Sequence, residues 1–297
     1  MTQTILSASS CFLAHLRFAG TIACVTFAMP ELPDVETFKR YFDASSLHQR
    51  IGHVDVRDAY ILKDISAYEL ARRLKGRQFK SSRRHGKHLF VRADDDLWLR
   101  LHFGMTGSLH YLKHDEQAPK YARVLFVFTN NHRLAFEDQR KFGEIGLLKD
   151  VDEFLRERAV GPDALDITLS EFKEMFGKHG GAVKTILLNQ KLVAGIGNIY
   201  ADEILFRTRV QPATQISSLS GKTVTKLFRA TRYILKRAIE ANADVALMPK
   251  LWLLAHRGKG GKCPGCGRKL RSATIGGRTA WFCAHCQKSA SEVRLPA

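Results

Sequence analysis

Four cysteines close to the C-terminal end of the chain have the spacing of a metal site. Cys263 and Cys266 form one C-x2-C pair, and Cys283 and Cys286 form a second pair after sixteen intervening residues. Four thiolates at this spacing can complete a tetrahedral shell around one Zn²⁺ ion, and a shell closed by protein ligands is structural rather than catalytic. The spacing therefore predicts one structural zinc ion held by these four residues.

The segment between the two pairs is typical of a β-hairpin. Gly276 and Gly277 are flanked by residues that favour strands, as expected for a two-residue hairpin turn. The segment is also basic, with Arg268, Lys269, Arg271 and Arg278. It could lie against DNA, or it could belong to a module that only folds the C-terminal end. We favour the first interpretation because of the charge of the whole chain.

The composition indicates a polyanionic partner. The 297 residues include 47 Lys and Arg against 29 Asp and Glu, which gives a formal net charge of +18. Nucleic acid is the first candidate, because Lys and Arg bind nucleic acid by neutralising phosphates. A basic enzyme that does not bind nucleic acid is the alternative. The cysteine pattern does not resemble a disulfide framework, so we expect a reducing compartment.

Residues 1–28 differ from the rest of the chain. They contain no Asp, Glu or Lys, and Arg17 is their one charged residue. A signal peptide, an organelle transit peptide and a misplaced start codon are the three interpretations. A signal peptide places its positive residues before the apolar core, whereas Arg17 lies within the apolar part. After Met29, no uncharged apolar stretch reaches eighteen residues, so we expect no transmembrane helix.

The order of the expected elements indicates an α+β protein. Residues 33–42 are expected to form a helix with Pro33 in its first turn. Residues 51 to about 148 are expected to form strands, with a turn at Asn130-Asn131, and this block indicates a β-sandwich or barrel. Trp98, Arg100 and His102 would share one face of an alternating strand.

The pattern becomes helical after a linker at Gly161-Pro162. Thr168 and Glu171 have the spacing of a capping box at a helix N-terminus. Helical periodicity then covers 183–192, 198–207 and about 220–241, and the last 35 or so residues form the small metal module.

Four motifs, in order along residues 29 to 287, resemble the formamidopyrimidine-DNA glycosylase family. They are MPELPDVE at 29–36, RKFG at 140–143, GIGNIYADE at 195–203, and the zinc module. The resemblance implies a β-sandwich N-terminal domain, a helix–two-turn–helix domain, a zinc-finger β-hairpin and a DNA-binding cleft. The expected divisions are an extension at 1–28, a catalytic domain at 29–160, a DNA-binding helical domain at 161–250 and a zinc finger at 251–297.

The resemblance also implies a nucleophile. In the family it is the α-amine of an N-terminal proline, which here is Pro30. With residues 1–29 attached, Pro30 nitrogen is an amide without a usable lone pair, so Met29 is the preferred start and a transit peptide cut before Pro30 is the alternative. A neutral amine can attack deoxyribose C1′, expel the base and form an iminium that permits β- and δ-elimination. Glu31 would carry protons in these steps.

The remaining site residues are expected to bind and open the duplex. The resemblance assigns Lys87, Asn198 and Arg278 to phosphates, with Lys184 and His102 as weaker candidates. The alternatives are a solvated lysine for Lys87 and a plain N-cap for Asn198. Since a stacked base must be flipped before attack, the resemblance assigns Met105, Arg140 and Phe142 to the wedge that fills its place. Core packing is the alternative for Met105 and Phe142.

Two departures from the family pattern concern the lesion. Asp34 replaces the more usual glutamate, and 244–256 is shorter than the loop that covers the flipped base in relatives specialised for oxidised purines. Ring-opened purines, oxidised pyrimidines and abasic sites therefore all remain candidate substrates. The start typical of the endonuclease VIII branch is also missing.

These observations predict a base-excision repair glycosylase that also cleaves at abasic sites. We expect a monomer that acts on damaged double-stranded DNA, needs no cofactor other than zinc, and lies in the cytoplasm with the nucleoid. A damage-binding relative without catalysis and an AP lyase without glycosylase activity are the two competing interpretations.

Overall fold

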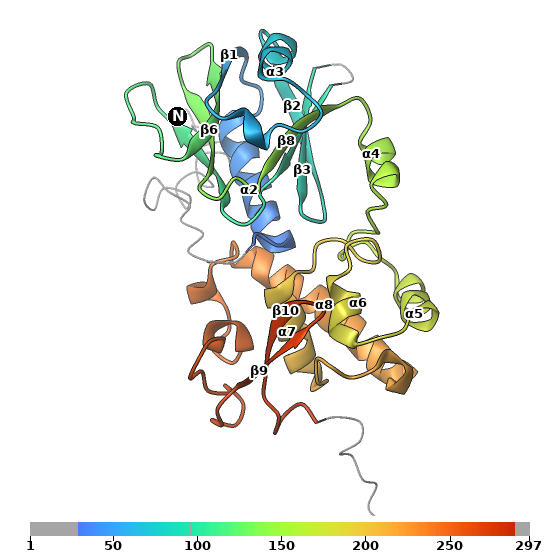
Figure 1. Ribbon diagram of the computed structural model, residues 1–297. Helices are drawn as coiled ribbons and strands as arrows, with labels where there is room; N and C mark the ends of the chain where they lie inside the picture. Colours follow the sequence, from blue (N-terminus) through green and yellow to red (C-terminus); the bar gives the residue numbers. More distant parts are fainter. Residues whose placement is uncertain (1–28, 95–96, 289–297) are drawn as a thin grey trace, which may run out of the picture. The chain divides into compact units, whose positions relative to one another are not determined.

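The computed structural model describes residues 29–94 and 97–288 (Figure 1). It separates into two compact units. The first unit comprises 38–83 and 91–149, and the second comprises 29–37, 84–90 and 150–288. The expected leader at 1–28 lies outside the described residues. No helix in 29–94 or 97–288 is both long enough and apolar enough to cross a membrane.

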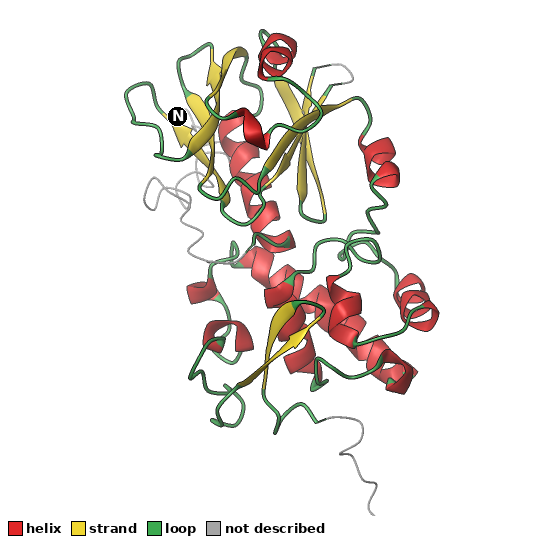
Figure 2. Cartoon of the chain, viewed as in Figure 1, coloured by secondary structure: helices red, strands yellow, loops and turns green. Residues whose placement is uncertain are grey.

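The first unit contains most of two four-stranded sheets, with strand orders β1-β6-β7-β5 and β2-β3-β4-β8 (Figure 2). Residues 84–90, which include the end of β2 and the start of β3, belong to the second unit. The pairs β1–β6, β6–β7, β5–β7 and β4–β8 are antiparallel. The strands are β1 (Ile51–Val56), β2 (Phe79–His85), β3 (His88–Ala93), β4 (Trp98–His102), β5 (Gly107–Leu112), β6 (Ala122–Phe128), β7 (Arg133–Asp138) and β8 (Glu144–Leu148).

An aromatic core joins the sheets to each other and to helix α2 (Leu32–Ser46). The rings of Phe79 in β2 and Phe126 in β6 meet edge to face with centroids 6.0 Å apart. From α2, Phe42 lies 5.1 Å from Phe79, and Phe38 lies 4.3 Å from Phe103. Buried aromatic pairs add specific geometry to the burial of large apolar surfaces. The predicted β-sandwich is confirmed.

Two helical segments interrupt the β block that the sequence predicted as strands alone. They are the 3₁₀ turn η1 (Ala59–Ile61) and helix α3 (Ala67–Leu74). Ser66 caps α3 by accepting from the backbone N–H of Glu69 at 3.1 Å. Ser66 and Glu69 are a helix-start signal that the strand interpretation overlooked. The N-terminal helix is also longer than the expected 33–42.

The helices of the second unit bury one shared apolar core, to which α5, α6, α7 and α8 each contribute. The helices are α4 (Val151–Glu157), α5 (Leu169–Lys178), α6 (Val183–Leu188), α7 (Asn198–Thr208) and α8 (Gly221–Glu240). The capping box of Thr168 and Glu171 is confirmed at the start of α5. Helix α6 ends four residues earlier than the periodicity to 192 indicated, because Asn189 adopts extended backbone angles.

The C-terminal hairpin consists of β9 (Arg271–Ile275) and β10 (Arg278–Phe282). Gly276 and Gly277 form its turn with φ of +56° and +72°. Two consecutive positive φ values are what a type I′ turn requires, and glycine supplies them without steric cost. A small core beside the hairpin joins Leu253 and Leu270 to Cys263 and Cys283. Short 3₁₀ turns precede this module, among them η3 (Val245–Leu247) and η4 (Leu253–His256).

Candidate active site

The four cysteines of the C-terminal module lie close enough together to bind one metal ion. Their sulfur atoms are all within 4.8 Å of one another. The Sγ atoms of Cys263 and Cys286 are 3.8 Å apart, and those of Cys266 and Cys283 are 3.5 Å apart. A tetrahedral shell with Zn–S bonds of about 2.3 Å separates its sulfurs by about 3.8 Å. The donor set and its geometry therefore fit a structural zinc ion.

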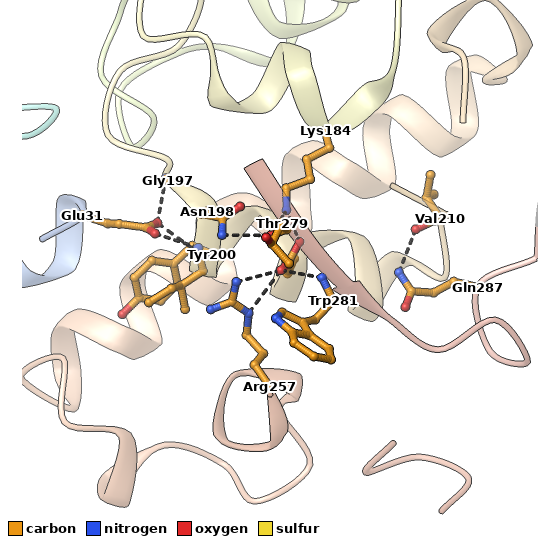
Figure 3. A network of polar contacts seen from close by, with 12 residues as sticks. Glu31, Lys184, Gly197, Asn198, Tyr200, Val210, Arg257, Thr279, Trp281 and Gln287 are labelled. Atoms are coloured by element: carbon orange, nitrogen blue, oxygen red, sulfur yellow. Dashed lines mark hydrogen bonds and ion pairs between the residues drawn. The ribbon is translucent and has the colours of Figure 1, made fainter. Parts of the chain in front are cut away.

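Glu31 is anchored on the N-terminus of helix α7, in the second unit (Figure 3). Its Oε2 accepts from the N–H of Gly197 at 2.6 Å and its Oε1 accepts from the N–H of Ile199 at 2.7 Å. A weaker bond from the N–H of Tyr200 measures 3.3 Å. A helix N-terminus favours an anion because its first N–H groups have no partner within the helix. Here the anion is a side chain of the protein.

The backbone around Glu31 is fixed as firmly as its carboxylate. The N–H of Leu32 donates to the carbonyl of Gly195 at 3.0 Å. A Cβ at Gly197 would lie only 2.3 Å from Cδ of Glu31, so that close approach requires a glycine. Asp34, the departure from the family pattern, accepts from the N–H of Glu31 at 2.9 Å. The side chain of Asp34, which is shorter than that of a glutamate, thus holds Glu31, the residue that follows Pro30.

A tight turn in the second unit presents Lys87. Its preceding residue, Gly86, has φ +54° and donates its N–H to Asp163 at 2.7 Å. Arg84 also pairs with Asp163, whose side chain is 1% exposed. The Lys87 ammonium itself forms no hydrogen bond or ion pair with any residue in the part of the chain that the structure describes.

The charges of Glu31 and Lys87 each affect the pKa of the other side chain. Burial raises the pKa of the Glu31 carboxyl above its ordinary value, although the charge of Lys87 and the N–H of Ile199 oppose this. Burial lowers the pKa of the Lys87 ammonium. The negative charge of Glu31 opposes this decrease, and the positive charge of Arg278 adds to it. Such perturbed pairs are common where proton transfer takes place.

Asn198 is the first residue of α7, and Gly197 is the N-cap. The N-cap alternative for Asn198 is therefore wrong. Its Nδ2 donates to the carbonyl of Thr279 at 3.0 Å, while its Oδ1 is buried without a hydrogen-bond partner among the described residues. Glu31 occupies the neighbouring N–H groups of Gly197, Ile199 and Tyr200, but not the backbone N–H of Asn198. That N–H and the second Nδ2 proton are the donors that Asn198 could offer to a phosphate.

Lys184 is buried rather than exposed to a ligand. Its side chain is 0% exposed, and its Nζ forms an ion pair with Asp202 at 2.6 Å. The same nitrogen donates to the carbonyl of Thr279 at 3.2 Å. This corrects the expectation that Lys184 contacts DNA, because an ammonium enclosed by protein acceptors does not reach a phosphate. Arg278, which precedes Thr279, is exposed directly after the glycine turn.

In the first unit, a buried aspartate organises the two loops that were expected to form the wedge. Asp138, which is 0% exposed, accepts from the hydroxyl of Thr106 and from the N–H groups of Arg140 and Gly143. A Cβ at Gly104 would lie 2.3 Å from the carbonyl carbon of Phe142, so the two loops are in close contact.

The residues at the tips of these loops differ in exposure. Phe142 is 53% exposed, and the Arg140 guanidinium lies 5.1 Å from its ring centroid. Met105 is half-buried. Core packing is therefore wrong as the alternative for Phe142. His102, at the end of β4, is half-buried and accepts from the N–H of Gly104 at 3.2 Å through Nδ1, so it helps to fix the same loop.

Sequence reasoning missed three buried aspartates, Asp138, Asp163 and Asp202. Each positions a segment that carries candidate site residues. A buried aspartate has no local signature, because most aspartates are solvated. The one signal in the sequence was that Asp202 lies within the GIGNIYADE motif, although the resemblance assigned no role to this residue.

The chain matches three family models in order. They are the formamidopyrimidine-DNA glycosylase N-terminal domain at 29–145, the formamidopyrimidine-DNA glycosylase H2TH domain at 159–248, and the zinc finger found in FPG and IleRS at 260–288. Together these matches include the sandwich, the helical core and the four cysteines.

Two relatives share close to a third of their residues with this chain. The formamidopyrimidine-DNA glycosylase of Bacillus subtilis is 34% identical over 274 residues, which cover 87% of this chain and 99% of that protein. The formamidopyrimidine-DNA glycosylase of Arabidopsis thaliana is 31% identical over 277 residues, which cover 88% of this chain and 71% of that protein.

Solved structures of the Lactococcus lactis enzyme share the fold. One, bound non-covalently to DNA with an AP site, has a TM-score of 0.79 and 28% identity and covers 87% of this chain and 100% of that one. Another, with DNA containing N7-benzyl-Fapy-dG, has a TM-score of 0.79 and 26% identity, covering 88% and 100%. The chain therefore belongs to the formamidopyrimidine-DNA glycosylase family, and it is a base-excision repair DNA glycosylase with AP lyase activity.

Proposed function

We propose that the amine of Pro30 is the nucleophile of this glycosylase once residues 1–29 have been removed. The nitrogen lone pair forms a bond to C1′ as the glycosidic bond breaks and the base leaves with a proton. The nitrogen then loses its proton and the C1′–O4′ bond opens as O4′ takes up a proton, which gives an iminium between Pro30 and C1′. Removal of a C2′ proton sends its electron pair toward the iminium and expels the 3′ phosphate, and removal of a C4′ proton then expels the 5′ phosphate. The docking of Glu31 on α7 is the observation that carries this proposal, because it fixes the neighbouring residue within the second unit.

Glu31 is proposed as the proton carrier of these steps. Burial raises the pKa of its carboxyl, which favours the protonated form that can donate a proton. Lys87 is proposed to hold a phosphate beside the lesion. In support, its ammonium has no partner among the described residues, and Asp163 anchors the turn that presents it.

Asn198 and Arg278 are proposed as the other phosphate contacts, and His102 as a residue that acts through the loop it fixes. Met105, Arg140 and Phe142 are proposed as the wedge. The exposed ring of Phe142 can enter a base step, and Arg140 can bond to the base left without its partner. Lys184 is proposed to contact other residues of the protein and not the DNA.

Damaged double-stranded DNA is the proposed partner, with ring-opened or oxidised bases and abasic sites as the substrates. Complexes of the Lactococcus lactis relative with abasic DNA and with N7-benzyl-Fapy-dG DNA support this choice. We further propose that the protein acts as a monomer on nucleoid DNA in the cytoplasm. Sedimentation of the protein with and without a lesion duplex tests the monomer.

Borohydride trapping tests the nucleophile. A chain that begins at Pro30 and a matched chain that retains residues 1–29 are incubated with abasic duplex and borohydride. Only the first is expected to become linked to DNA, because an amide nitrogen cannot form an iminium. Equal trapping of both chains would refute the role of Pro30.

Release of a ring-opened purine from a duplex then separates glycosylase activity from AP lyase activity. The chain that begins at Pro30 is expected to release the base and nick the strand. Nicking of abasic DNA without base release would refute the proposed lesion class.

A further inference from the structure

A cluster of three charges lies in the second unit, with Lys184 and Asp202 buried and Arg257 half-buried, and the chemical steps above do not use it. Asp202 in α7 is 0% exposed and pairs with Lys184 at 2.6 Å and with Arg257 at 2.9 Å (Figure 3). Arg257 donates twice to the same oxygen, from Nη2 and from Nε at 3.1 Å. Removing three charges from water is costly, so a cluster of this kind needs good geometry and additional hydrogen bonds to persist.

The additional hydrogen bonds of this cluster lead to the zinc hairpin. Asp202 accepts from the N–H of Trp281 at 3.0 Å. Lys184 donates to the carbonyl of Thr279 at 3.2 Å, and Asn198 donates to the same carbonyl at 3.0 Å. Strand β10 is therefore held on α7 at two alternate residues, directly after Arg278 in the chain.

We propose that Asp202 is a positioning residue that sets the place of Arg278 through Trp281, Lys184 and Thr279. Zinc holds the hairpin at its base, through Cys283, whereas the Gly276-Gly277 turn lies at the far end. A two-stranded hairpin is marginal by itself. The buried charges supply the second attachment, and Arg278 lies between that attachment and the turn.

This assignment rests on the proposed phosphate contact of Arg278. It predicts that the loss of Asp202 and the loss of Arg278 remove the same contact. Each neutralised phosphate changes the slope of log affinity against log salt by about 0.9 on duplex DNA. That slope reports a contact to DNA, and a change in stability alone does not move it.

The experiment measures the affinity for a duplex with a tetrahydrofuran abasic analogue over a range of salt concentrations. The variants are Arg278→Ala, Asp202→Asn and the double variant, all zinc-loaded and assayed below their unfolding temperatures. We expect each single variant to lose about 0.9 from the slope and the double variant to lose no more than either single variant. Losses that add in the double variant, or an unchanged slope in Asp202→Asn, would overturn the assignment.

Two further variants make the result specific. Lys184→Met keeps Asp202 paired with Arg257 and removes the ion pair of Lys184 with Asp202 together with one of the two bonds to Thr279, so it serves if Asp202→Asn does not fold. It is expected to lower the slope by part of the same amount, and an unchanged slope would count against the assignment. Glu203→Gln is the matched control, because the carboxylate of Glu203 accepts from Leu254 at 3.0 Å and not from the hairpin. Its slope is expected to equal that of the parent, and an equal loss there would overturn the assignment.

The two proposals fail in different ways. If Arg278→Ala leaves the slope unchanged, the phosphate contact proposed for Arg278 is wrong. If Arg278→Ala lowers the slope and Asp202→Asn does not, the phosphate contact stands and the positioning role falls.

Discussion

Asp138 in the first unit and Asp202 in the second each fix a segment of the chain by accepting hydrogen bonds, but from different kinds of donor. Both are 0% exposed, and both hold a segment that carries residues proposed to contact DNA. Asp138 accepts from uncharged donors, namely a hydroxyl and two backbone N–H groups. Asp202 accepts from two cations and one backbone N–H.

The difference follows from what each aspartate must hold. The loop at 140–143 directs two backbone N–H groups inward, and one carboxylate can satisfy both together with the hydroxyl of Thr106. The hairpin pairs its own backbone groups, so it offers few free donors to a neighbour. Cations from elsewhere in the second unit supply the missing attraction. We expect the second arrangement to depend on charge far more than the first does.

Removal of zinc should separate the two regions most clearly. Chelation is expected to unfold the hairpin and lower the affinity for abasic duplex at least tenfold, because binding of a structural metal is coupled to folding. Fluorescence of Trp281 reports the hairpin, and a Trp281→Phe variant identifies its share of the signal. Zinc added back should restore both readouts. A chelated protein that keeps its hairpin signal and its affinity would contradict the prediction.

Asp202→Asn should destabilise the fold by about 3 kcal/mol, because it leaves the buried Lys184 and the half-buried Arg257 without their anion. Urea unfolding measures the loss. Adding Lys184→Met is expected to recover part of it, since one of the uncompensated charges is then removed as well. A double variant that is less stable than Asp202→Asn alone would show that repulsion between the cations is not the cause.

Glu203, the neighbour of Asp202, gives a pH test. Burial raises the pKa of its carboxyl from 4.5 to about 7, although the N–H groups of Leu254 and Leu253 oppose this. A raised folded-state pKa stabilises the fold fully below the unfolded value and loses that contribution as pH rises through about 7. The loss is up to about 3 kcal/mol at 1.36 kcal/mol per unit.

Glu203→Gln is expected to flatten this dependence in urea unfolding between pH 5 and pH 8. The exposed Glu174 provides the control, since Glu174→Gln should leave the slope of stability against pH as it is in the parent. A Glu203→Gln variant with the parental slope would show that another group titrates in this range.

Asp138→Asn should lower the free energy of unfolding by the smallest amount, about 2 kcal/mol, because the amide keeps one acceptor and loses one charge-assisted bond. The affected donor is expected to be the N–H of Gly143, which is 2.6 Å from Asp138. Urea unfolding gives the energy, and affinity for abasic duplex shows whether the loops shift. A loss of stability larger than that of Asp202→Asn would contradict the expectation that the Asp202 cluster depends more on charge than Asp138 does.

The zinc hairpin was predictable because its signals are local. The two cysteine pairs, the Gly-Gly turn and the basic strands all lie within a short stretch of sequence. The capping box and the bounds of α7 and α8 followed from local patterns too. Helix α3 was missed because the β-rich pattern on both sides hid the short signal at Ser66 and Glu69.

The contacts that assemble the site were not predictable in the same way. Glu31 meets Gly197 and Ile199 across 166 and 168 residues of sequence, and no periodicity encodes such a pair. Lys184 was misplaced because a lysine bound to phosphate and a lysine paired with a buried aspartate have the same sequence appearance. Only the fold shows which acceptor lies beside the ammonium.

The docking of Glu31 has a consequence for how catalysis could be switched on. The hydrogen bonds described above for Glu31 and Leu32 do not use the nitrogen of Pro30. Residues joined ahead of Pro30 would therefore leave these contacts able to form. If the amine of Pro30 is the nucleophile, as proposed, cleavage would require a free amine at residue 30, whereas the docking of Glu31 would not.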